Sequence, residues 1–398
     1  MKILLITDAY PPMKTSTAVL FDDLCQEFRR KNYDLTVVLP DSHLKKSWSY
    51  GVENGIKVLR LSTPVTKDIN FFRRTINESL LSFFMYLNLR KSPLWTQRWD
   101  YIIWHSPTIF FGPLIKLLKI KTKAKTYLIL RDIFPEWALN LGILKKGIIY
   151  NFFKFFEKLQ YSVADIIGVQ TPANLLYFHQ LDIAHNPKIV VLNNWITDNL
   201  KPDSDFTVDL SKFKNRIIFV YAGNMGVAQN LSLLIETAKI LRHNEEIGFL
   251  FVGRGGEKEE LKNNATRNGL KNIIFLDEIN PSDIPQLYKR CHSGLVMLDI
   301  RHKTHNIPGK FMGYLINGLP VVARINPGND LIKIIEINKL GRYITNDSAD
   351  DFSKKILELH QLLKHDKQLI DRCVTFAQNN FSTSTAVTQI MHDLTNSN

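Results

Sequence analysis

The sequence predicts an α/β protein built from two Rossmann-like parallel-sheet domains that face each other across a cleft. Its 398 residues exceed the roughly 250–300 at which a single hydrophobic core stops growing. Short apolar runs alternate with helical patterns along both halves of the chain, which is typical of parallel sheets covered by helices on both faces. A polar stretch at 198–214 separates the two alternations and indicates a linker.

The individual elements follow from this alternation. Several predicted strands of the first half are unbroken β-branched or aliphatic runs, the kind that is buried on both faces; the strands are 2–7, 35–39, 56–61, 101–104, 126–130, 165–169 and 189–192. In the second half the predicted strands are 217–221, 248–252, 273–276, 295–298 and 321–323, and the helices are 230–242, 257–268, 281–291 and 310–317. Two helical stretches, 349–363 and 367–380, precede a polar tail. We therefore expect an N-terminal domain of residues 1–198 and a C-terminal domain of residues 199–375.

The net charge of +13 is concentrated in one region. Residues 45–160 hold 20 Lys/Arg against 7 Asp/Glu and so carry the whole excess. A local basic excess indicates a polyanionic partner, either nucleic acid or an anionic membrane face. Nucleic acid is the weaker interpretation, because predicted buried strands interrupt the segment and it contains no recognised binding motif.

The sequence favours a cytoplasmic protein attached peripherally to the inner face of a membrane. At the N-terminus a short apolar run is followed at once by Asp8 and a proline pair, unlike a signal peptide. No stretch reaches the roughly 18 uninterrupted apolar residues that span a bilayer. The three cysteines fit no zinc or disulfide spacing, which favours reduced thiols.

Two amphipathic patterns in the basic segment fit either an interfacial helix on anionic lipid or a helix packed on the sheet. The first has apolar residues at helical spacing between two pairs of cations: Leu80, Phe83, Phe84 and Leu87. Its flanking charge leaves both interpretations open. The second, residues 145–158, mixes aromatic residues with lysines, and we interpret it as mainly core.

Loops that follow the strands of the first half carry candidate site residues, because ligands of parallel sheets bind at the carboxyl ends of the strands. Ser16 and Thr17 open a helix after the first strand, where backbone amides favour anions; a simple helix cap fits almost as well. His105 follows the strand at 101–104 and can donate to a sugar hydroxyl, although a lone histidine more often has a structural role.

The loop after the strand at 126–130 is a stronger candidate. Its charged and aromatic residues are costly to order unless they have partners or a function. Asp132 and Glu136 are placed to orient an acceptor hydroxyl or to act as a base. The alternative is an ion pair with Arg131 and a helix cap.

Glycine loops follow two consecutive strands of the second half. Gly223, Asn224 and Gly226 form the first loop, and Gly253 and Arg254 belong to the second. Glycine lets backbone amides approach a phosphate closely, but any tight turn also favours it. The two loops together predict a nucleotide cradle.

The segment 299–314 is the most informative. Arg301, Lys303 and Lys310 are cations able to neutralise a leaving diphosphate. Pro308 stands at a helix start, where the amides of the first turn face an anion. The alternative is a solvated basic loop. Because cations and amides can carry the charge, we expect no metal and no other cofactor.

These motifs resemble family 4 retaining glycosyltransferases of the GT-B fold over nearly the whole chain. The resemblance lies in Tyr10-Pro11-Pro12, residues 132–136, 221–226, 306–314 and 318–323. More narrowly, the sequence is similar to N-acetyl-L-fucosamine (L-fucosamine) transferases of O-antigen and capsule biosynthesis.

The resemblance implies roles for several residues. Ser16 and Thr17 occupy the loop where the family has paired glycines near the diphosphate and acceptor. Gly223, Asn224 and Gly253 belong to the nucleotide-diphosphate loops, and Ile307, Pro308 and Gly309 offer amides to phosphate or sugar. The last helix, within 376–398, is expected to cross back onto the first domain.

The sequence also departs from the family pattern. Two glutamates eight positions apart are replaced by His305 and Gly313. The phosphate-clamping Arg and Lys after the strand at 217–221 are replaced by Asn224 and Gln229. Arg254, Lys303 and Lys310 are candidates to compensate, and His105, Asp132, Glu136 and His305 are the candidate catalytic residues.

We therefore expect sugar transfer from a UDP-sugar, with N-acetyl-L-fucosamine suggested by the resemblance, to a hydroxyl of a lipid-linked oligosaccharide. The resemblance implies retention of configuration, with the donor phosphate taking the acceptor proton. Two alternatives remain open. A nucleotide-sugar 2-epimerase would need no membrane acceptor, so the charge in 45–160 argues against it. A non-catalytic scaffold of a polysaccharide assembly complex is suggested by His305 and Gly313.

Overall fold

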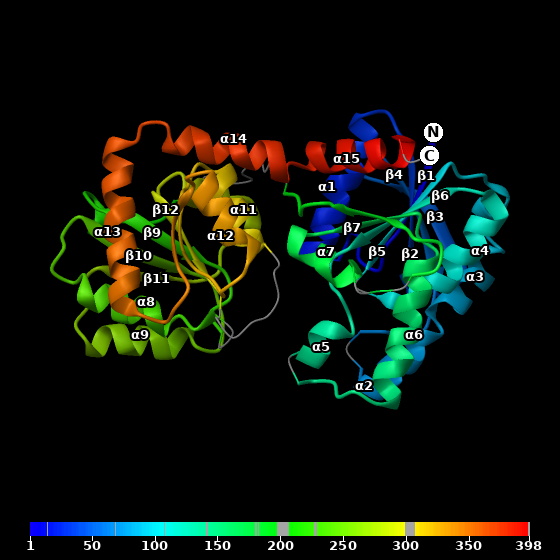
Figure 1. The fold of residues 1–398 in the computed structure, drawn as a ribbon, viewed down its shortest axis with the longest axis horizontal. Helices are drawn as coiled ribbons and strands as arrows, with labels where there is room; N and C mark the ends of the chain where they lie inside the picture. Colours follow the sequence, from blue (N-terminus) through cyan, green and yellow to red (C-terminus); the bar gives the residue numbers. More distant parts are fainter. Residues whose placement is uncertain are drawn as a thin grey trace. The chain divides into compact units, whose positions relative to one another are not determined.

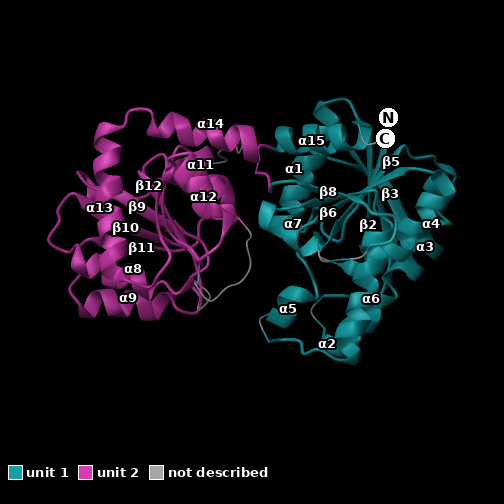
Figure 2. Cartoon of the chain, viewed as in Figure 1, with its two compact units in different colours: residues 1–193, 383–398 teal, residues 194–382 magenta. Residues whose placement is uncertain are grey.

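The chain folds into two compact units. The computed structural model describes residues 1–13, 15–67, 69–106, 108–140, 142–179, 181, 183–196, 207–226, 229–298 and 307–396. Unit 1 comprises residues 1–193 and 383–398, and unit 2 comprises residues 194–382 (Figure 2). The division after Asn193 lies a few residues before the boundary that the sequence suggests at 198, and the chain returns to unit 1 at Thr383 rather than at 376.

Unit 1 contains an eight-stranded sheet in its described residues (Figure 1). All neighbouring strands pair in parallel except β3, which is antiparallel to β4. In sheet order the strands are β3 (Trp48–Glu53), β4 (Ile56–Ser62), β2 (Asp34–Asp41), β1 (Lys2–Ile6), β5 (Tyr101–Ser106), β6 (Lys125–Leu130), β7 (Ile166–Val169) and β8 (Lys188–Val191). The strand β3 was not predicted: Trp48, Tyr50 and Val52 alternate with small or polar residues, but the strand lies at the sheet edge and is largely exposed.

The helices of unit 1 lie between these strands in the chain, except α15, which follows the last one. They are α1 (Ser16–Arg30), α2 (Phe71–Ser79), α3 (Leu81–Leu89), α4 (Gly112–Thr122), α5 (Glu136–Asn140), α6 (Ile148–Ser162), α7 (Pro172–His179) and α15 (Thr383–Asn396), with 3-10 turns η1 (Pro93–Thr96) and η2 (Ile109–Phe111). One core cluster joins β1, β5, β6 and β7 to α3 and α4 through residues such as Ile6, Trp104 and Leu128.

Unit 2 contains a six-stranded parallel sheet in the part of the chain that is described. Its order is β11 (Ile273–Leu276), β10 (Ile247–Val252), β9 (Ile217–Ala222), β12 (Ser293–Met297), β13 (Val321–Arg324) and β14 (Gly341–Ile344). The short edge strand β14 has only four residues and was not predicted. The predicted class, α/β with two Rossmann-like sheets, is confirmed.

The helices of unit 2 include α8, which packs with α13, and α11, which packs with α14. They are α8 (Ser232–Ile240), α9 (Lys258–Arg267), α10 (Ile284–Tyr288), α11 (Gly309–Ile316), α12 (Asp330–Ile337), α13 (Ala349–His365) and α14 (Leu369–Phe381), with 3-10 turns η3 (Ser211–Phe213) and η5 (Pro281–Asp283).

The residues after 380, which composition alone predicts as a polar tail, form helix α15, within the range 376–398 where the resemblance implies a last helix. One face of α15 buries apolar residues of unit 1, among them Val387 and Ile390. α15 packs on α1 and β6, whereas α14 belongs to unit 2 (Figures 1 and 2). Threonines and other polar residues stand between the apolar positions of α15, so the segment is polar on average although one side of the helix is apolar.

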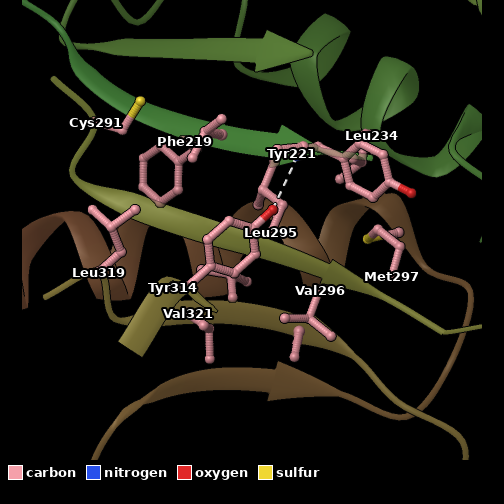
Figure 3. Packing of buried hydrophobic residues seen from close by; sticks show 14 of the residues in the cluster. Phe219, Tyr221, Leu234, Cys291, Leu295, Val296, Met297, Tyr314, Leu319 and Val321 are labelled. Atoms are coloured by element: carbon pink, nitrogen blue, oxygen red, sulfur yellow. Dashed lines mark hydrogen bonds between the residues drawn. The ribbon is translucent and has the colours of Figure 1, made fainter. Parts of the chain in front are cut away.

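Tyr314 anchors α11 in the core of unit 2. Its ring lies among Phe219, Leu295 and Val321 (Figure 3), and its hydroxyl accepts a hydrogen bond from the Ala222 amide at 3.0 Å. A Cβ at Gly294 would come within 2.2 Å of this ring, so glycine makes the close approach possible. The anchor fixes the start of α11 beside the loop that follows β9.

Candidate active site

The loops after β9 and β10 are bound to each other. The Gly223 amide donates to the Val252 carbonyl at 2.9 Å, and the Met225 amide donates to the Arg254 carbonyl at 2.7 Å. A Cβ at Gly253 would lie 2.1 Å from the Gly223 oxygen, and Gly253 has a φ of +138°. The second glycine loop is therefore explained by its contact with the first loop, without any need for a phosphate.

Lys310 lies over the first glycine loop. Its Nζ donates to the Tyr221 hydroxyl at 2.6 Å and lies 4.1 Å from the centroid of the Tyr221 ring. A Cβ at position 223 would lie 2.5 Å from Lys310 Cε, so Gly223 leaves the space that the lysine fills. The Tyr221 hydroxyl donates in turn to the Asn224 carbonyl at 2.6 Å.

Burial lowers the pKa of Lys310 to about 8. The cation stands next to the N-terminus of α11, because Pro308 is the N-cap of that helix and Gly309 is its first residue. The partial positive charge of a helix N-terminus favours an anion at this place. A half-buried cation and a helix N-terminus thus act on the same small region of unit 2.

The remaining predicted donor residues of unit 2 have different surroundings. Asn224 Nδ2 and the Gly226 amide both donate to Gln229 Oε1, at 3.3 Å each. Arg254 is 80% exposed and lies 3.3 Å from a carboxylate oxygen of Glu278, whereas Ile307 is buried. Arg301, Lys303 and His305 lie outside the described residues.

Unit 1 presents a second polar cluster at the carboxyl ends of β1 and β5. Ile6 is paired with Trp104, so Asp8, two residues past the end of β1, lies near His105, which is the second-to-last residue of β5 rather than after it. His105 Nδ1 and Asp8 Oδ1 are 3.8 Å apart, which is too long for a hydrogen bond. Among the described residues neither atom has a hydrogen-bond partner, although both are buried. A buried polar pair of this kind is suited to accepting a hydroxyl or a water molecule between its members.

The electrostatics of this pair favour an ionised aspartate and a neutral histidine. Burial lowers the pKa of His105, and Asp8 opposes that effect. Burial acts to raise the pKa of Asp8, but His105 and Lys67 outweigh it and hold the pKa below its ordinary value. Lys67 Nζ is 3.9 Å from Asp8 Oδ2. The side chain of His105 is packed against Phe21, with ring centroids 4.4 Å apart.

The predicted site residues after β6 lie in two different surroundings, Asp132 near His105 and Glu136 in a separate network. Burial lowers the pKa of Arg131 to about 10. Asp132 is exposed, yet partial removal from water raises its pKa, with Arg131 and His105 acting in the opposite direction. Asp132 is therefore electrostatically coupled to the Asp8–His105 cluster.

Glu136 belongs to a separate network. It accepts from the Tyr150 hydroxyl at 2.6 Å and from Lys154 Nζ at 3.0 Å. Lys154 also forms an ion pair with Glu157, which is fully buried and accepts from the Tyr177 hydroxyl at 2.6 Å. The described hydrogen bonds of Glu136 thus connect α5 to α6.

The start of α1 differs in detail from the expectation. The N-cap is Thr15, whose side chain accepts from the Ala18 amide at 3.2 Å, rather than Ser16 or Thr17. Ser16 and Thr17 are the first two helical residues, so their own amides are among the unpaired donors of the first turn.

The described residues contain no group of three or more His, Cys, Asp or Glu side chains arranged to hold a metal ion. Nor does any helix within the described ranges have the length and apolar content needed to cross a membrane. Cys25, Cys291 and Cys373 are buried free thiols.

Asp8, Lys67 and Tyr221 have no role that the sequence predicts. Asp8 lies two residues after β1, which is a usable signal once the neighbouring strand is known. Tyr221 is read from sequence as a strand residue, and Lys67 lies in a polar loop without a motif. Only the folded structure brings these side chains to their partners.

Comparison with known proteins agrees with this architecture. Residues 204–373 match the family model "Glycosyl transferases group 1". The chain is 25% identical over 312 residues to the putative colanic acid biosynthesis glycosyl transferase WcaI of Escherichia coli K12, covering 73% of this chain and 76% of the relative. It is 23% identical over 235 residues to the probable glycosyltransferase WbjE of Pseudomonas aeruginosa, covering 56% and 57%.

Among solved structures, Anabaena HepE in complex with UDP superimposes with a TM-score of 0.65 at 16% identity, over 99% of this chain and 100% of HepE. This likeness shows the fold of both units. The chain therefore has the GT-B fold, and its residues 204–373 are similar to group 1 glycosyltransferases.

Proposed function

We propose that the protein transfers a sugar from a UDP-sugar to a hydroxyl of a lipid-linked saccharide, with retention of configuration, during synthesis of a bacterial surface polysaccharide. The name of WcaI refers to colanic acid biosynthesis, and HepE was crystallised with UDP. The narrower sequence resemblance suggests N-acetyl-L-fucosamine as the sugar. A lipid-linked acceptor would bring the protein to the cytoplasmic face of the inner membrane.

The observation that carries the proposal is the position of Lys310. Its ammonium, held between the Tyr221 hydroxyl and the Gly223 loop, is next to the N-terminus of α11. Negative charge develops on the diphosphate as the sugar–phosphate bond breaks. We assign Lys310 and the amides of Gly309 and Lys310 to the stabilisation of that charge, so the residues of unit 2 supply positive charge without requiring a metal.

On the acceptor side we assign Asp8 and His105 to the binding of the reacting hydroxyl. Neutral His105 can donate to or accept from a hydroxyl, and ionised Asp8 can accept its proton in a hydrogen bond. Asp132 is assigned to the same acceptor region through its electrostatic coupling to His105. In the retaining mechanism that the family resemblance implies, the donor phosphate takes the acceptor proton, and these side chains orient the hydroxyl.

Glu136 is assigned a positioning role. Its two hydrogen bonds, to Tyr150 and Lys154, hold α5 against α6. A group that acts as a base needs an accessible lone pair directed at the substrate. The hydrogen bonds of Glu136 instead support the loop that carries Asp132.

Thermal unfolding in metal-free buffer, with UDP, ADP and a panel of UDP-sugars, tests the donor assignment. A ligand at 100 times its dissociation constant adds about 2.7 kcal/mol to the free energy of unfolding. We expect a clear rise in Tm with UDP and a larger one with the correct UDP-sugar. Lys310→Met should lose most of the rise, whereas Lys289→Met, at an exposed lysine of unit 2, should keep it.

If no nucleotide raises the Tm of the wild-type protein, the donor assignment fails and a non-catalytic scaffold becomes the better account. If UDP binds but incubation with a UDP-sugar yields only an epimerised nucleotide sugar, the reaction class is wrong. Transfer to a lipid-linked acceptor, with the anomeric configuration of the product determined by NMR, supports the full proposal.

A further inference from the structure

Helix α2 is unusual because none of its residues is buried. Phe72 is 75% exposed and Ile76 is 43% exposed, and the same stripe continues past the helix end to Leu80 and Phe83, exposed by 42% and 55%. These four positions are spaced by four, four and three residues, so they fall on one side of the α2–α3 segment. Four large apolar side chains therefore face water together.

Helix α6 has a second exposed apolar stripe. Its inner face buries Phe153, Glu157 and Tyr161. On its outer face Ile148 is 90% exposed, Phe155 is 64% exposed and Phe152 is 38% exposed. The interpretation of this segment as mainly core is therefore wrong for half of the helix. One side of α6 packs inward, but the opposite side also carries apolar and aromatic residues, and these are exposed to solvent.

The two stripes flank the same structural element, η2. The hydroxyl of Ser82, next to Phe83, donates to the Phe110 carbonyl of η2. The Phe110 ring lies 6.3 Å from the ring of Phe152. Figure 2 draws α2 and α6 at the same end of unit 1. We call the exposed residues of the two stripes the apolar platform: Phe72, Ile76, Leu80, Phe83, Ile148, Phe152 and Phe155.

The charge around the apolar platform is positive. Lys145, Lys146 and Lys158 are exposed on or beside α6, whereas the only carboxylate in residues 142–162, Glu157, is fully buried. On α2, Arg73 is exposed, and the single acidic residue Glu78 is paired with Arg74 at 2.8 Å. Exposed aromatic residues bordered by lysines and arginines match the interface of a bilayer that contains anionic lipid.

We infer that the apolar platform and its bordering cations dock unit 1 onto an anionic lipid surface. The aromatic side chains would enter the boundary between headgroups and acyl chains, while Lys145, Lys146 and Arg73 contact lipid phosphates. Exposed apolar patches bordered by polar residues commonly mark the surfaces by which proteins bind membranes or partner proteins. The inference deepens the proposed function, on which it rests for the reason to bind a membrane, because it names the surface that meets the lipid-linked acceptor.

The test is co-sedimentation of the full chain with vesicles of phosphatidylglycerol and phosphatidylcholine, compared with vesicles of phosphatidylcholine alone. We expect binding to the anionic vesicles to be at least about tenfold stronger and to weaken with added salt. Phe72→Ser/Phe83→Ser and Ile148→Ser/Phe155→Ser should each weaken binding about tenfold or more. Lys145→Glu/Lys146→Glu should do the same through charge.

Matched controls remove equivalent groups elsewhere. Ile120→Ser/Ile337→Ser removes two isoleucines that are 69% and 76% exposed outside the apolar platform. Lys271→Glu/Lys289→Glu reverses two exposed charges of unit 2. Both controls should bind anionic vesicles like the wild-type protein. All variants change exposed side chains, and thermal unfolding verifies that they fold.

Several outcomes would overturn the inference. The first is that the platform variants bind anionic vesicles as strongly as the wild-type protein does. The second is that vesicle binding does not depend on lipid charge. The third is that the protein binds no vesicles but forms a dimer, which the Phe variants dissociate. The last outcome would assign the platform to a second copy of the chain. The UDP-dependent rise in Tm, measured on the same preparations, separates the docking hypothesis from the donor-site hypothesis. UDP binding without vesicle binding would contradict only the docking surface. Vesicle binding without UDP binding would contradict only the donor assignment.

Discussion

The Nζ atom of Lys310 lies 2.6 Å from the phenolic oxygen of Tyr221 and 4.1 Å from the centroid of its ring. A phenol and an aromatic face hold a cation in place without neutralising it. Burial lowers the pKa of this lysine to about 8, so the charge is present at neutral pH but costs free energy. An incoming diphosphate would relieve that cost, which is why we place the donor there.

The pKa of Lys310 predicts a pH-dependent donor affinity. A bound diphosphate favours the protonated lysine, and above pH 8 the free protein must take up a proton to bind it. We expect UDP affinity of the wild-type protein to fall by up to about tenfold per pH unit above pH 8. Lys310→Arg, whose charge does not titrate there, should show a flat profile by isothermal calorimetry. Equal profiles would contradict the assignment.

The same pKa predicts an opposite trend for the ligand-free protein. The folded-state pKa of about 8 lies below the ordinary value of 10.5, so between these values the unfolded chain binds the proton and the folded chain does not. The free-energy penalty of burying this lysine is therefore fully present below pH 8 and is relieved as the pH rises toward 10.5. Over this range the free energy of unfolding of the wild type should rise relative to that of Lys310→Met, as urea denaturation can measure.

Gly253 tests the contact between the two glycine loops. In Gly253→Ala the Cβ would lie 2.1 Å from the Gly223 oxygen at a φ of +138°, so we expect a loss of at least about 2 kcal/mol in the free energy of unfolding. Gly256→Ala is the control, because its Cβ would meet nothing within 4 Å. It should change stability by less than about 0.5 kcal/mol. Similar losses in both variants would argue against the loop contact.

Gly313 stands on α11 at the position where the resemblance to family 4 glycosyltransferases implies a glutamate, and a Cβ there would meet nothing within 4 Å. We expect Gly313→Glu to be tolerated and to raise UDP affinity roughly tenfold, because a carboxylate can accept hydrogen bonds from ribose hydroxyls. The gain should disappear with a dideoxyribose analogue of UDP. An equal gain with both nucleotides would show that the new carboxylate acts elsewhere.

Asp8→Asn should separate catalysis from donor binding. We expect kcat to fall about 100-fold, because the amide keeps the shape but loses the charge that orients the acceptor hydroxyl beside His105. The Tm shift with UDP should not change. Asp34→Asn, at the opposite end of the neighbouring strand β2, is the control and should retain full kcat. Loss of UDP binding in Asp8→Asn would refute the acceptor assignment.

The network around Glu157 predicts a large stability effect. Lys154→Met leaves the fully buried Glu157 without its cation, so we expect a loss of about 3–5 kcal/mol. Adding Glu157→Gln to Lys154→Met should restore part of the lost free energy of unfolding. Glu136→Gln should cost only about 1 kcal/mol and retain most of kcat. A well-folded Glu136→Gln protein with kcat reduced by 100-fold or more would show that Glu136 is catalytic after all.

Local patterns determined much of this protein. The alternation of strands and helices, the two glycine loops and the helix start at Pro308 are visible in the sequence, because each depends on residues close together in the chain. The approach of Lys310 to Tyr221 and of His105 to Asp8 depends instead on which strands become neighbours, and the partners lie 89 and 97 residues apart. Likewise, helical periodicity shows that α6 is amphipathic. Only packing decides that its inner side covers the sheet while Ile148, Phe152 and Phe155 stay in contact with water, since exposure depends on what the rest of the chain leaves uncovered.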